Sequence, residues 1–282
     1  MIKIIESPRE AMQGLQKIIP TEAKVQYINA LLKVGFDTIE TGSYVSPRLI
    51  PQMADSLEVL SKIDAEDSKT KIMFLVVNSK GAEKISSESV VTHLSYPFSI
   101  SPSFLLKNLN TSTKESLITV ERISELCRKT NKEPVIYVSM AFGNTFDDAW
   151  SLEILEEGVR QIYERGIRII PLSNVSIEID AALISKVYNH LLARFPDVEF
   201  GLHLHTSNEG FMAKVSAAWD AGVRRFDSVM TGLGGCPLAE NELLGNLSTE
   251  NLLTFTESRK VTNNLNFALL QSSSRLASKI ML

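Results

Sequence analysis

Strand-like and helix-like segments alternate along almost the whole chain, and this alternation constrains the fold more than any other feature. Eight short apolar runs predict strands, and most are continuous rather than alternating, which is typical of parallel strands covered on both faces. The predicted strands span residues 2–6, 38–41, 71–77, 90–96, 134–141, 167–173, 198–205 and 224–230. Parallel strands need helical connections, so the pattern predicts an α/β protein.

Helix-like segments lie between these strands, and two of them carry clear end signals. Ser151 is a favoured N-cap for the segment 151–166, which ends at Gly166, and Thr21 is expected to cap the segment 21–35. The other predicted helices span residues 51–62, 81–88, 114–131, 177–194 and 209–221, and two or three more follow the eighth strand. Eight strand–helix units favour a (β/α)8 TIM barrel over the alternative, an open parallel sheet.

No linker, low-complexity stretch or change of composition divides the 282 residues into separate parts. We therefore expect one TIM-barrel domain over residues 1–282, with the barrel at about 1–260 and a helical extension at about 261–282. Apolar residues make up 44% of the chain, which is enough for a sizeable core. The first strand lacks the G-x-G-x-x-G fingerprint, and no strand is followed by a phosphate-binding G-x-x-x-x-G-K-S/T loop, which disfavours nucleotide-binding folds.

The charge balance argues against two classes of partner, and the cysteine count indicates the cellular setting. The formal net charge is −4, without a basic stripe, which argues against nucleic acid or an anionic membrane as the partner. No apolar run reaches the roughly 18 residues of a membrane helix. The two cysteines, Cys127 and Cys236, are too few for a disulfide framework, and the N-terminus lacks the features of a signal or transit peptide. We therefore expect a reduced, cytoplasmic protein.

Polar and ionisable side chains collect where the predicted strands end, which is where TIM barrels place their active sites. His203 and His205 end the seventh strand, and residues i and i+2 of a strand point to the same face, so the two imidazoles should project together. The other candidates are Arg9 and Glu10 after the first strand, Glu40 in the second, Asn174 after the sixth, and Cys236 and Asn246 in the loop after the eighth.

These residue types suit a divalent cation, although each also has a purely structural interpretation. Two imidazoles with carboxylate and amide oxygens are suitable ligands for Mg²⁺, Mn²⁺, Co²⁺ or Zn²⁺. A strand-end histidine is otherwise a hydrogen-bonded structural residue, and Arg9 with Glu10 is otherwise a solvated pair. A buried Glu40 requires an arginine or a metal as its partner. Cys236 is either an inert packing residue or, on a glycine-rich loop, a catalytic acid or base.

Over nearly its whole length the chain resembles the 3-hydroxy-3-methylglutaryl-CoA lyases, a family of metal-dependent TIM-barrel lyases related to Claisen-type synthases. The histidine pair is shared by that wider superfamily, whereas GLGGCP together with SYVSP and PQM is specific to the lyases. The segments that carry the resemblance are ETGSYVSPRLIPQMAD (40–55), VSMAFG (138–143), HLH (203–205), GLGGCP (232–237) and GNLSTENL (245–252).

The resemblance implies cleavage of an acyl-CoA, 3-hydroxy-3-methylglutaryl-CoA, into acetoacetate and acetyl-CoA with the help of Mg²⁺ or Mn²⁺, with Co²⁺ or Zn²⁺ as alternatives. Arg9 would stabilise the enolate on the thioester carbonyl, Glu40 would orient Arg9, and Cys236 would be the catalytic thiol. The resemblance also implies a homodimer and a role in leucine breakdown. The implied metal ligands are Glu10, His203, His205 and Asn246, with His203 also catalytic, and the implied substrate-binding residues are Gln13, Asn174 and Glu250.

Several positions depart from the family pattern, and they leave the function open among three alternatives. Glu10 replaces an aspartate, Asn174 replaces an acidic residue near the substrate, and Thr206 replaces an aspartate after the histidine pair. One extra residue separates Cys236 from Asn246. The chain is therefore a 3-hydroxy-3-methylglutaryl-CoA lyase, a related lyase or aldolase for another 3-hydroxy acid or acyl-CoA, or a non-catalytic barrel that has lost the activity.

Overall fold

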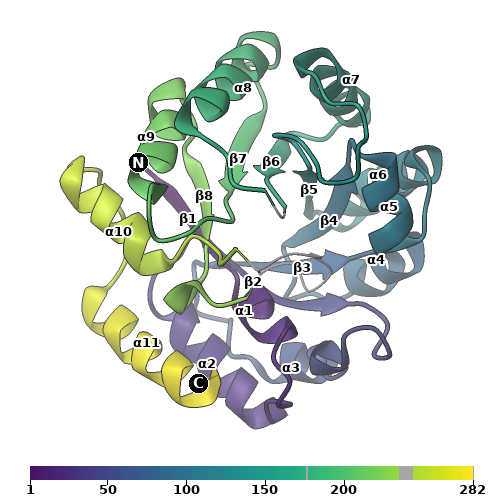
Figure 1. The fold of residues 1–282 in the computed structure, drawn as a ribbon. Coiled ribbons are helices and arrows are strands. Elements are labelled where there is room, and N and C mark those ends of the chain that lie inside the picture. Colours follow the sequence, from purple (N-terminus) through teal and green to yellow (C-terminus); the bar gives the residue numbers. More distant parts are fainter. Residues whose placement is uncertain (176, 235–243, 282) are drawn as a thin grey trace.

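Eight parallel strands close into a barrel in the computed structural model, which describes residues 1–175, 177–234 and 244–281. Each strand pairs with the next, and β1 pairs in parallel with β8 to close the ring (Figure 1). The strands are β1 (Lys3–Glu6), β2 (Thr38–Tyr44), β3 (Lys71–Val76), β4 (His93–Ser99), β5 (Glu133–Ser139), β6 (Ile169–Ser173), β7 (Glu199–His203) and β8 (Arg225–Ser228). The predicted (β/α)8 barrel is confirmed, and the open sheet is excluded.

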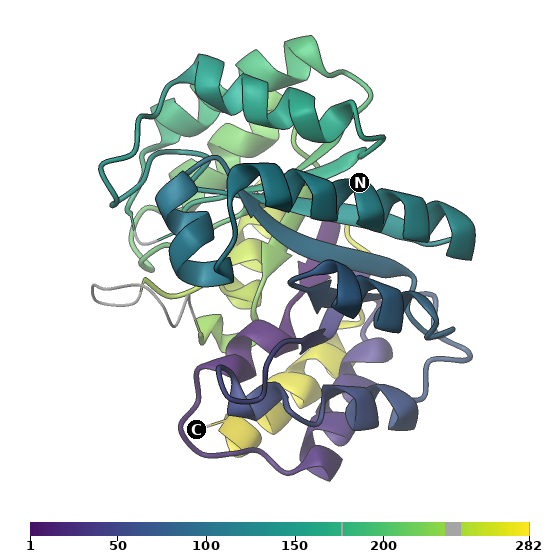
Figure 2. The same cartoon turned by 90° about the vertical axis from the view of Figure 1, so that its right-hand side faces the viewer.

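Helices form a ring outside the barrel, seen along the barrel axis in Figure 1 and from the side in Figure 2. They are α1 (Pro8–Gln13), α2 (Thr21–Leu32), α3 (Ser56–Lys62), α4 (Ser79–Ser86), α5 (Pro102–Leu109), α6 (Thr113–Thr130), α7 (Leu152–Tyr163), α8 (Ala181–Arg194), α9 (Phe211–Ala221), α10 (Thr249–Ser258) and α11 (Phe267–Met281), with short 3-10 helices η1 (Pro51–Met53) and η2 (Met230–Gly232). Within the described ranges, none of these helices is both long and apolar enough to cross a membrane.

The α-helices α10 and α11 follow β8, where the sequence predicts two or three helices, and α11 lies in the predicted extension at about 261–282. Figure 1 shows α11 lying beside α2 on the outside of the barrel. The backbone N–H of Asn266, just before α11, donates to the carbonyl of Val34 at 2.7 Å. The extension therefore packs onto the start of the chain.

Some strand boundaries differ from the predicted ones because pairing with neighbouring strands decides where a strand ends. β2 continues to Tyr44, through an irregularity between Glu40 and Gly42 in its pairing with β3. β4 begins and ends later than predicted and includes Pro97. Its pairing with β3 stops at Ser95, whereas its pairing with β5 continues to the end of the strand. The missing N–H of proline therefore breaks no bond to β3.

Two short helices, α1 and α5, are absent from the sequence prediction. Both have proline in the first turn, Pro8 and Pro102, where its fixed φ favours the start of a helix. Ser151 caps α7 as predicted. Thr21 is not a cap, because it is the first residue of α2 and its hydroxyl donates to the carboxylate of Asp55 instead.

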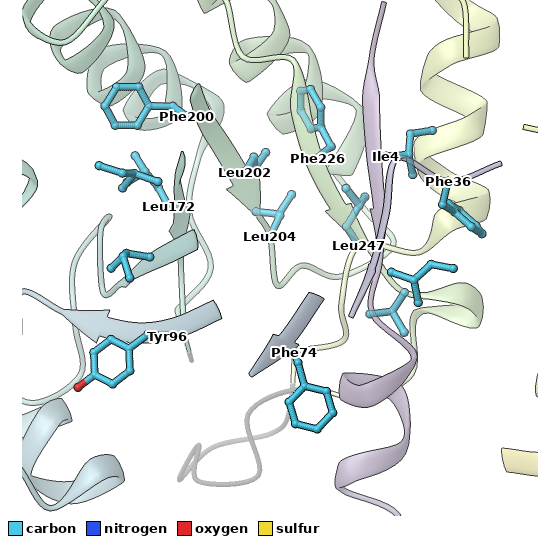
Figure 3. Close-up of a cluster of buried hydrophobic side chains, with 14 of the residues drawn as sticks. Ile4, Phe36, Phe74, Tyr96, Leu172, Phe200, Leu202, Leu204, Phe226 and Leu247 are labelled. Carbon is cyan, nitrogen blue, oxygen red and sulfur yellow. The ribbon is translucent and has the colours of Figure 1, made fainter. Parts of the chain in front are cut away.

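The barrel wall separates two layers of buried side chains. Phe200, Leu202 and Phe226 point outward from β7 and β8 and pack in the apolar layer under the helices (Figure 3). Successive strand residues face opposite sides, so the neighbour of Leu202, His203, faces the barrel interior. The interior layer contains the apolar residues Ile5, Met73, Val135 and Tyr137.

Candidate active site

The carboxyl ends of the strands surround a cavity of about 140 Å³. Of the ten residues predicted for the site, six line this cavity: Arg9, Glu10, Gln13, Glu40, His203 and His205. The other lining residues are Leu75, Pro97, Phe104, Tyr137, Ser139, Ser173 and Val175. Helix α1 begins two residues after β1, so it places three of the predicted side chains directly over the barrel mouth.

Arg9 is held in the cavity by hydrogen bonds to the carboxylate of Glu40 and to the side-chain amide of Gln13. Its Nε donates to Glu40 Oε2 at 2.8 Å, its Nη2 contacts the same oxygen, and its Nη1 donates to Gln13 Oε1 at 3.0 Å. The other oxygen of Glu40 accepts from the hydroxyl of Ser95 at 2.9 Å. An arginine carries five N–H donors, so these bonds fix the guanidinium and leave two donors for a ligand. The predicted pairing of Glu40 with Arg9 is present in the structure.

Glu10 lies against both imidazoles of the histidine pair. Its Oε2 is 3.4 Å from Nε2 of His203, and its Oε1 is 3.9 Å from Nε2 of His205. One ligand atom from each of these residues can be chosen so that all three lie within 4.8 Å of one another, and all three side chains are buried. Three ligands of these types, converging at this spacing, fit a divalent cation.

The electrostatics of this group favour a positive charge between two carboxylates. Burial alone would lower the pKa of His203, but the carboxylates of Glu10 and Asp227 outweigh burial and raise this pKa to about 10. Burial would raise the pKa of Glu10, but His203 and Arg9 hold it well below its usual range. Burial, together with the charge of His203, lowers the pKa of His205 to about 4. His205 is thus neutral at pH 7, as a metal ligand must be.

Asp227 is a site residue that the sequence analysis missed. Its Oδ2 lies 3.0 Å from Nδ1 of His203, on the side of the ring away from Glu10. Ser139 and Ser173, the last residues of β5 and β6, also line the cavity. An aspartate inside a buried strand such as RRFDSVM is the signal that would have identified Asp227, because a buried carboxylate needs a partner.

Asn174 is fully buried and lies behind the histidine pair rather than on the cavity wall. Its Oδ1 accepts from the backbone N–H of His205 at 2.9 Å, and its Nδ2 donates to the carbonyls of His205 and Ile177 at 2.7 and 2.8 Å. These contacts hold the chain just after β7. Substrate binding by Asn174 stays a prediction, and the contacts in the structure are those of a residue that positions His205.

Asn246 lies beside His205, as a metal ligand would, because the backbones of the two residues form an antiparallel bridge. Its Nδ2 donates to the carbonyl of Leu233 at 2.9 Å, which leaves the amide oxygen as the atom that a hard cation prefers. Glu250 lies outside the cavity, where it accepts from the backbone of Thr231 at 3.1 Å and from the hydroxyl of Ser274 at 3.3 Å. The predicted catalytic Cys236 is outside the described residues.

Comparison with known proteins identifies the family of the chain. The HMGL-like family model matches residues 2–277. A hydroxymethylglutaryl-CoA lyase of Bacillus subtilis is 31% identical over 268 residues, which cover 95% of this chain and 89% of the relative. An (R)-citramalyl-CoA lyase of Chloroflexus aurantiacus is 30% identical over 260 residues, which cover 88% of this chain and 80% of the relative.

The solved structure of an HMG-CoA lyase from Acinetobacter baumannii, in complex with coenzyme A and 3-methylmalate, superposes with a TM-score of 0.91 at 27% identity. The match covers 100% of this chain and 91% of that one. Fold, sequence and the residues at the barrel mouth therefore lead to the same conclusion. The chain belongs to the HMGL-like family.

Proposed function

We propose that this protein is a divalent-metal-dependent carbon–carbon lyase that cleaves 3-hydroxy-3-methylglutaryl-CoA into acetoacetate and acetyl-CoA. One observation carries the proposal: the Arg9–Glu40 pair and the Glu10–His203–His205 group, all buried side chains, line a single cavity at the barrel mouth. Glu10 keeps its carboxylate on both imidazoles despite its extra methylene. This contact argues against a barrel that has lost its metal ligands.

The ligand set suits Mg²⁺ or Mn²⁺, held by Glu10, His203 and His205 with Asn246 beside them. Hard divalent ions take carboxylate and amide oxygens, and a neutral imidazole completes such a site. A bound cation supplies Lewis acidity that favours loss of the proton from the substrate's tertiary hydroxyl. Co²⁺ or Zn²⁺ would fit the same donors.

Arg9 stabilises the second charge that develops in the reaction. When the hydroxyl proton leaves, the electron pair of the bond between C2 and C3 moves onto the thioester and forms an enolate, which is then protonated at C2. The two free N–H donors of Arg9 suit the enolate oxygen, because donors held in place before the reaction stabilise a developing charge best. Glu40 and Gln13 keep the guanidinium in position, and Cys236 is proposed as the acid or base.

A second candidate reaction is the cleavage of citramalyl-CoA. The observation that favours it is the 30% identity with the (R)-citramalyl-CoA lyase over 88% of this chain. Both substrates are 3-hydroxy thioesters, so the same metal group and Arg9 would serve each of them. The two differ in the group attached to C3, which the cavity must accept.

The test is a mass-spectrometric assay of EDTA-treated protein with either thioester, with and without Mg²⁺ or Mn²⁺. Metal-dependent acetyl-CoA supports a lyase, and the second product distinguishes acetoacetate from pyruvate. The double variant His203→Ala/His205→Ala should lose activity and metal binding, whereas the matched control His190→Ala, which removes a histidine bonded to Glu156 outside the cavity, should keep both. Folded protein that binds metal but cleaves neither thioester would refute both reactions.

The finer properties implied by the family are also proposals. We propose a single catalytic domain, supported by the family match over residues 2–277, and a homodimer, supported by the resemblance. Leucine breakdown follows only if the substrate is 3-hydroxy-3-methylglutaryl-CoA. A reduced, cytoplasmic setting is supported by Cys127, which is buried and free.

A further inference from the structure

Arg225 and Asp227 are two charged residues of β8 that the proposed reaction leaves unused. Both point into the barrel interior, because each contacts an inward-facing residue of β7. Arg225 Nη1 lies 3.4 Å from Oε1 of Glu199, and Asp227 contacts His203. Arg225 is 1% exposed and Asp227 is 3% exposed. Burying charged groups is costly unless each has a partner, so their presence here requires an explanation.

The contact between Asp227 and His203 determines which ring nitrogen carries a proton. Nδ1 of His203 lies 3.0 Å from Oδ2 of Asp227. An ionised carboxylate can only accept a hydrogen bond, so Nδ1 must be the donor. The opposite nitrogen, Nε2, faces Glu10 at 3.4 Å. With the proton held on Nδ1, Nε2 is the nitrogen that can give its lone pair to a cation.

Arg225 supports Asp227 from deeper in the barrel. The two side chains interact electrostatically. Gly201 of β7 makes room for the arginine, because a Cβ at that position would lie 3.1 Å from Arg225 Cδ. Within the described residues, Nε and Nη2 of Arg225 and Oδ1 of Asp227 have no hydrogen-bond partner. Arg225 therefore acts on the carboxylate of Asp227 by its charge and by its position beside it.

We propose that Asp227, supported by Arg225, is a positioning residue that keeps the proton of His203 on Nδ1 and turns Nε2 toward the metal site. Neither Asp227 nor Arg225 lines the cavity, whereas His203 does, so Asp227 would act on the reaction through His203. This inference rests on the proposed metal-dependent function and extends it to the second layer of the site.

The test is the variant Asp227→Asn, because an asparagine both donates and accepts and no longer selects one tautomer. We expect Mn²⁺ binding, measured by calorimetry, to weaken about 10- to 100-fold, the usual effect of removing an outer partner of a ligating histidine. The matched control is Asp37→Asn, which removes a carboxylate that also interacts with Arg225 but has no contact with the histidine pair. The control should bind Mn²⁺ as the unmodified protein does.

A spectroscopic measurement separates positioning from a purely structural role. The chain has four histidines, so their ring ¹⁵N shifts can be assigned by single replacements. Above the raised pKa of His203 of about 10 the ring is neutral, and in the unmodified protein its single proton should then lie on Nδ1. In Asp227→Asn the shifts of the neutral ring should move toward a mixture of tautomers. If Nδ1 of His203 carries no proton in the unmodified protein, the inference is overturned even if the variant does not fold.

Replacement of Arg225 tests the second half of the proposal. Arg225→Met keeps an unbranched chain without charge and should weaken Mn²⁺ binding, whereas Arg225→Lys keeps the charge and should restore most of it. Equal losses in Asp227→Asn and Asp37→Asn would overturn the inference, because they would reflect net charge alone. If the unmodified protein binds no Mn²⁺, the proposed function fails, whereas the ¹⁵N shifts of His203 still test the positioning role.

Discussion

Glu10 stands where the family resemblance implies an aspartate, and charged groups surround its longer side chain. It lies in the short helix α1, and its carboxylate contacts both imidazoles and lies 3.8 Å from Nη2 of Arg9. A carboxylate shared between an arginine and two histidines is constrained from three directions. The length of the side chain at this position is therefore matched to the distance between α1 and β7.

The first prediction is that Glu10→Asp weakens the site, although aspartate is the residue of the family. The substitution withdraws the carboxylate by up to about 1.5 Å, the length of one C–C bond. A misplacement of about 1 Å costs on the order of 100-fold in rate, so metal-dependent turnover should fall by about that factor. Calorimetry with Mn²⁺ checks whether affinity falls with it, and Glu22→Asp at an exposed position is the control. Unchanged turnover would show that α1 shifts to compensate.

The side-chain amide of Asn174 holds backbone groups on both sides, which an acidic residue at this position could not do. Both of its amide atoms bind backbone groups, so Asn174→Asp, which restores an acidic residue, would replace a donor by an oxygen facing two carbonyls. We predict a loss of stability on the order of 2–4 kcal/mol, because two acceptors lose their donor and a carboxylate faces them in a buried place. Chemical denaturation measures the loss, with exposed Asn264→Asp as the control. A stability equal to that of the unmodified protein would contradict this account.

At the scale of elements, the close approach of α7 to the barrel depends on Gly158. A Cβ at this position would lie 2.6 Å from Cγ2 of Ile100, just after β4. Isoleucine is branched at Cβ and has few rotamers in which to move aside. Alanine favours helices more than glycine does, but the overlap here exceeds what a well-packed core tolerates.

We therefore predict that Gly158→Ala lowers the free energy of unfolding by about 1–2 kcal/mol, because overpacking costs about 1–3 kcal/mol and the helix propensity of alanine recovers up to 1. Gly14→Ala is the matched control, since nothing lies within 4 Å of its Cβ position and φ is −88°. The control should be neutral or slightly stabilising. Thermal and urea unfolding of both variants give the comparison, and equal shifts would contradict the packing argument.

At the scale of the whole molecule, Glu6 joins the first and last parts of the barrel. Its Oε1 accepts from the backbone N–H of Met230 at 2.7 Å, and its Oε2 lies 2.6 Å from the hydroxyl of Thr249. That hydroxyl is also 2.9 Å from the hydroxyl of Ser228. One proton of the Thr249 hydroxyl cannot serve both contacts at once, so the second bond takes a proton from Ser228 or from a protonated Glu6. Burial, which is the largest cause, raises the pKa of Glu6 to about 8.

This pKa makes stability depend on pH. Between about pH 4.5, the ordinary value, and pH 8, the folded protein keeps a proton on Glu6 that the unfolded chain has lost. The contribution of Glu6 to stability is therefore present in full below the lower value and decreases as pH rises through this window, by up to about 1.4 kcal/mol per pH unit.

The fourth prediction is that Glu6→Gln removes this dependence, because glutamine donates to Thr249 and accepts from Met230 at every pH. The variant should gain stability relative to the unmodified protein between pH 5 and pH 8, as measured by urea unfolding at several pH values. Glu121→Gln, at an exposed position of α6, should follow the unmodified protein throughout. A pH-independent difference between Glu6→Gln and the unmodified protein would contradict the raised pKa.

Local pattern was sufficient for the class of fold and for part of the site. Alternating apolar runs and helix signals predict eight strand–helix units because burial on both faces and helical periodicity leave marks within a few neighbouring residues. The spacing of His203 and His205 likewise predicts that they point the same way, because strand geometry is periodic. The short helices α1 and α5 were not predicted, because a proline at the start is their main local signal.

The sequence by itself determined the barrel, the histidine pair, and the location of Arg9 and Glu10 after the first strand and of Glu40 in the second. Only the tertiary structure decided that Asp227 lies behind His203, that Asn174 holds His205 rather than facing the cavity, and that Glu250 lies outside it. The physical reason is that these contacts join different strands and loops. Their geometry depends on how the barrel closes, and no local periodicity records it.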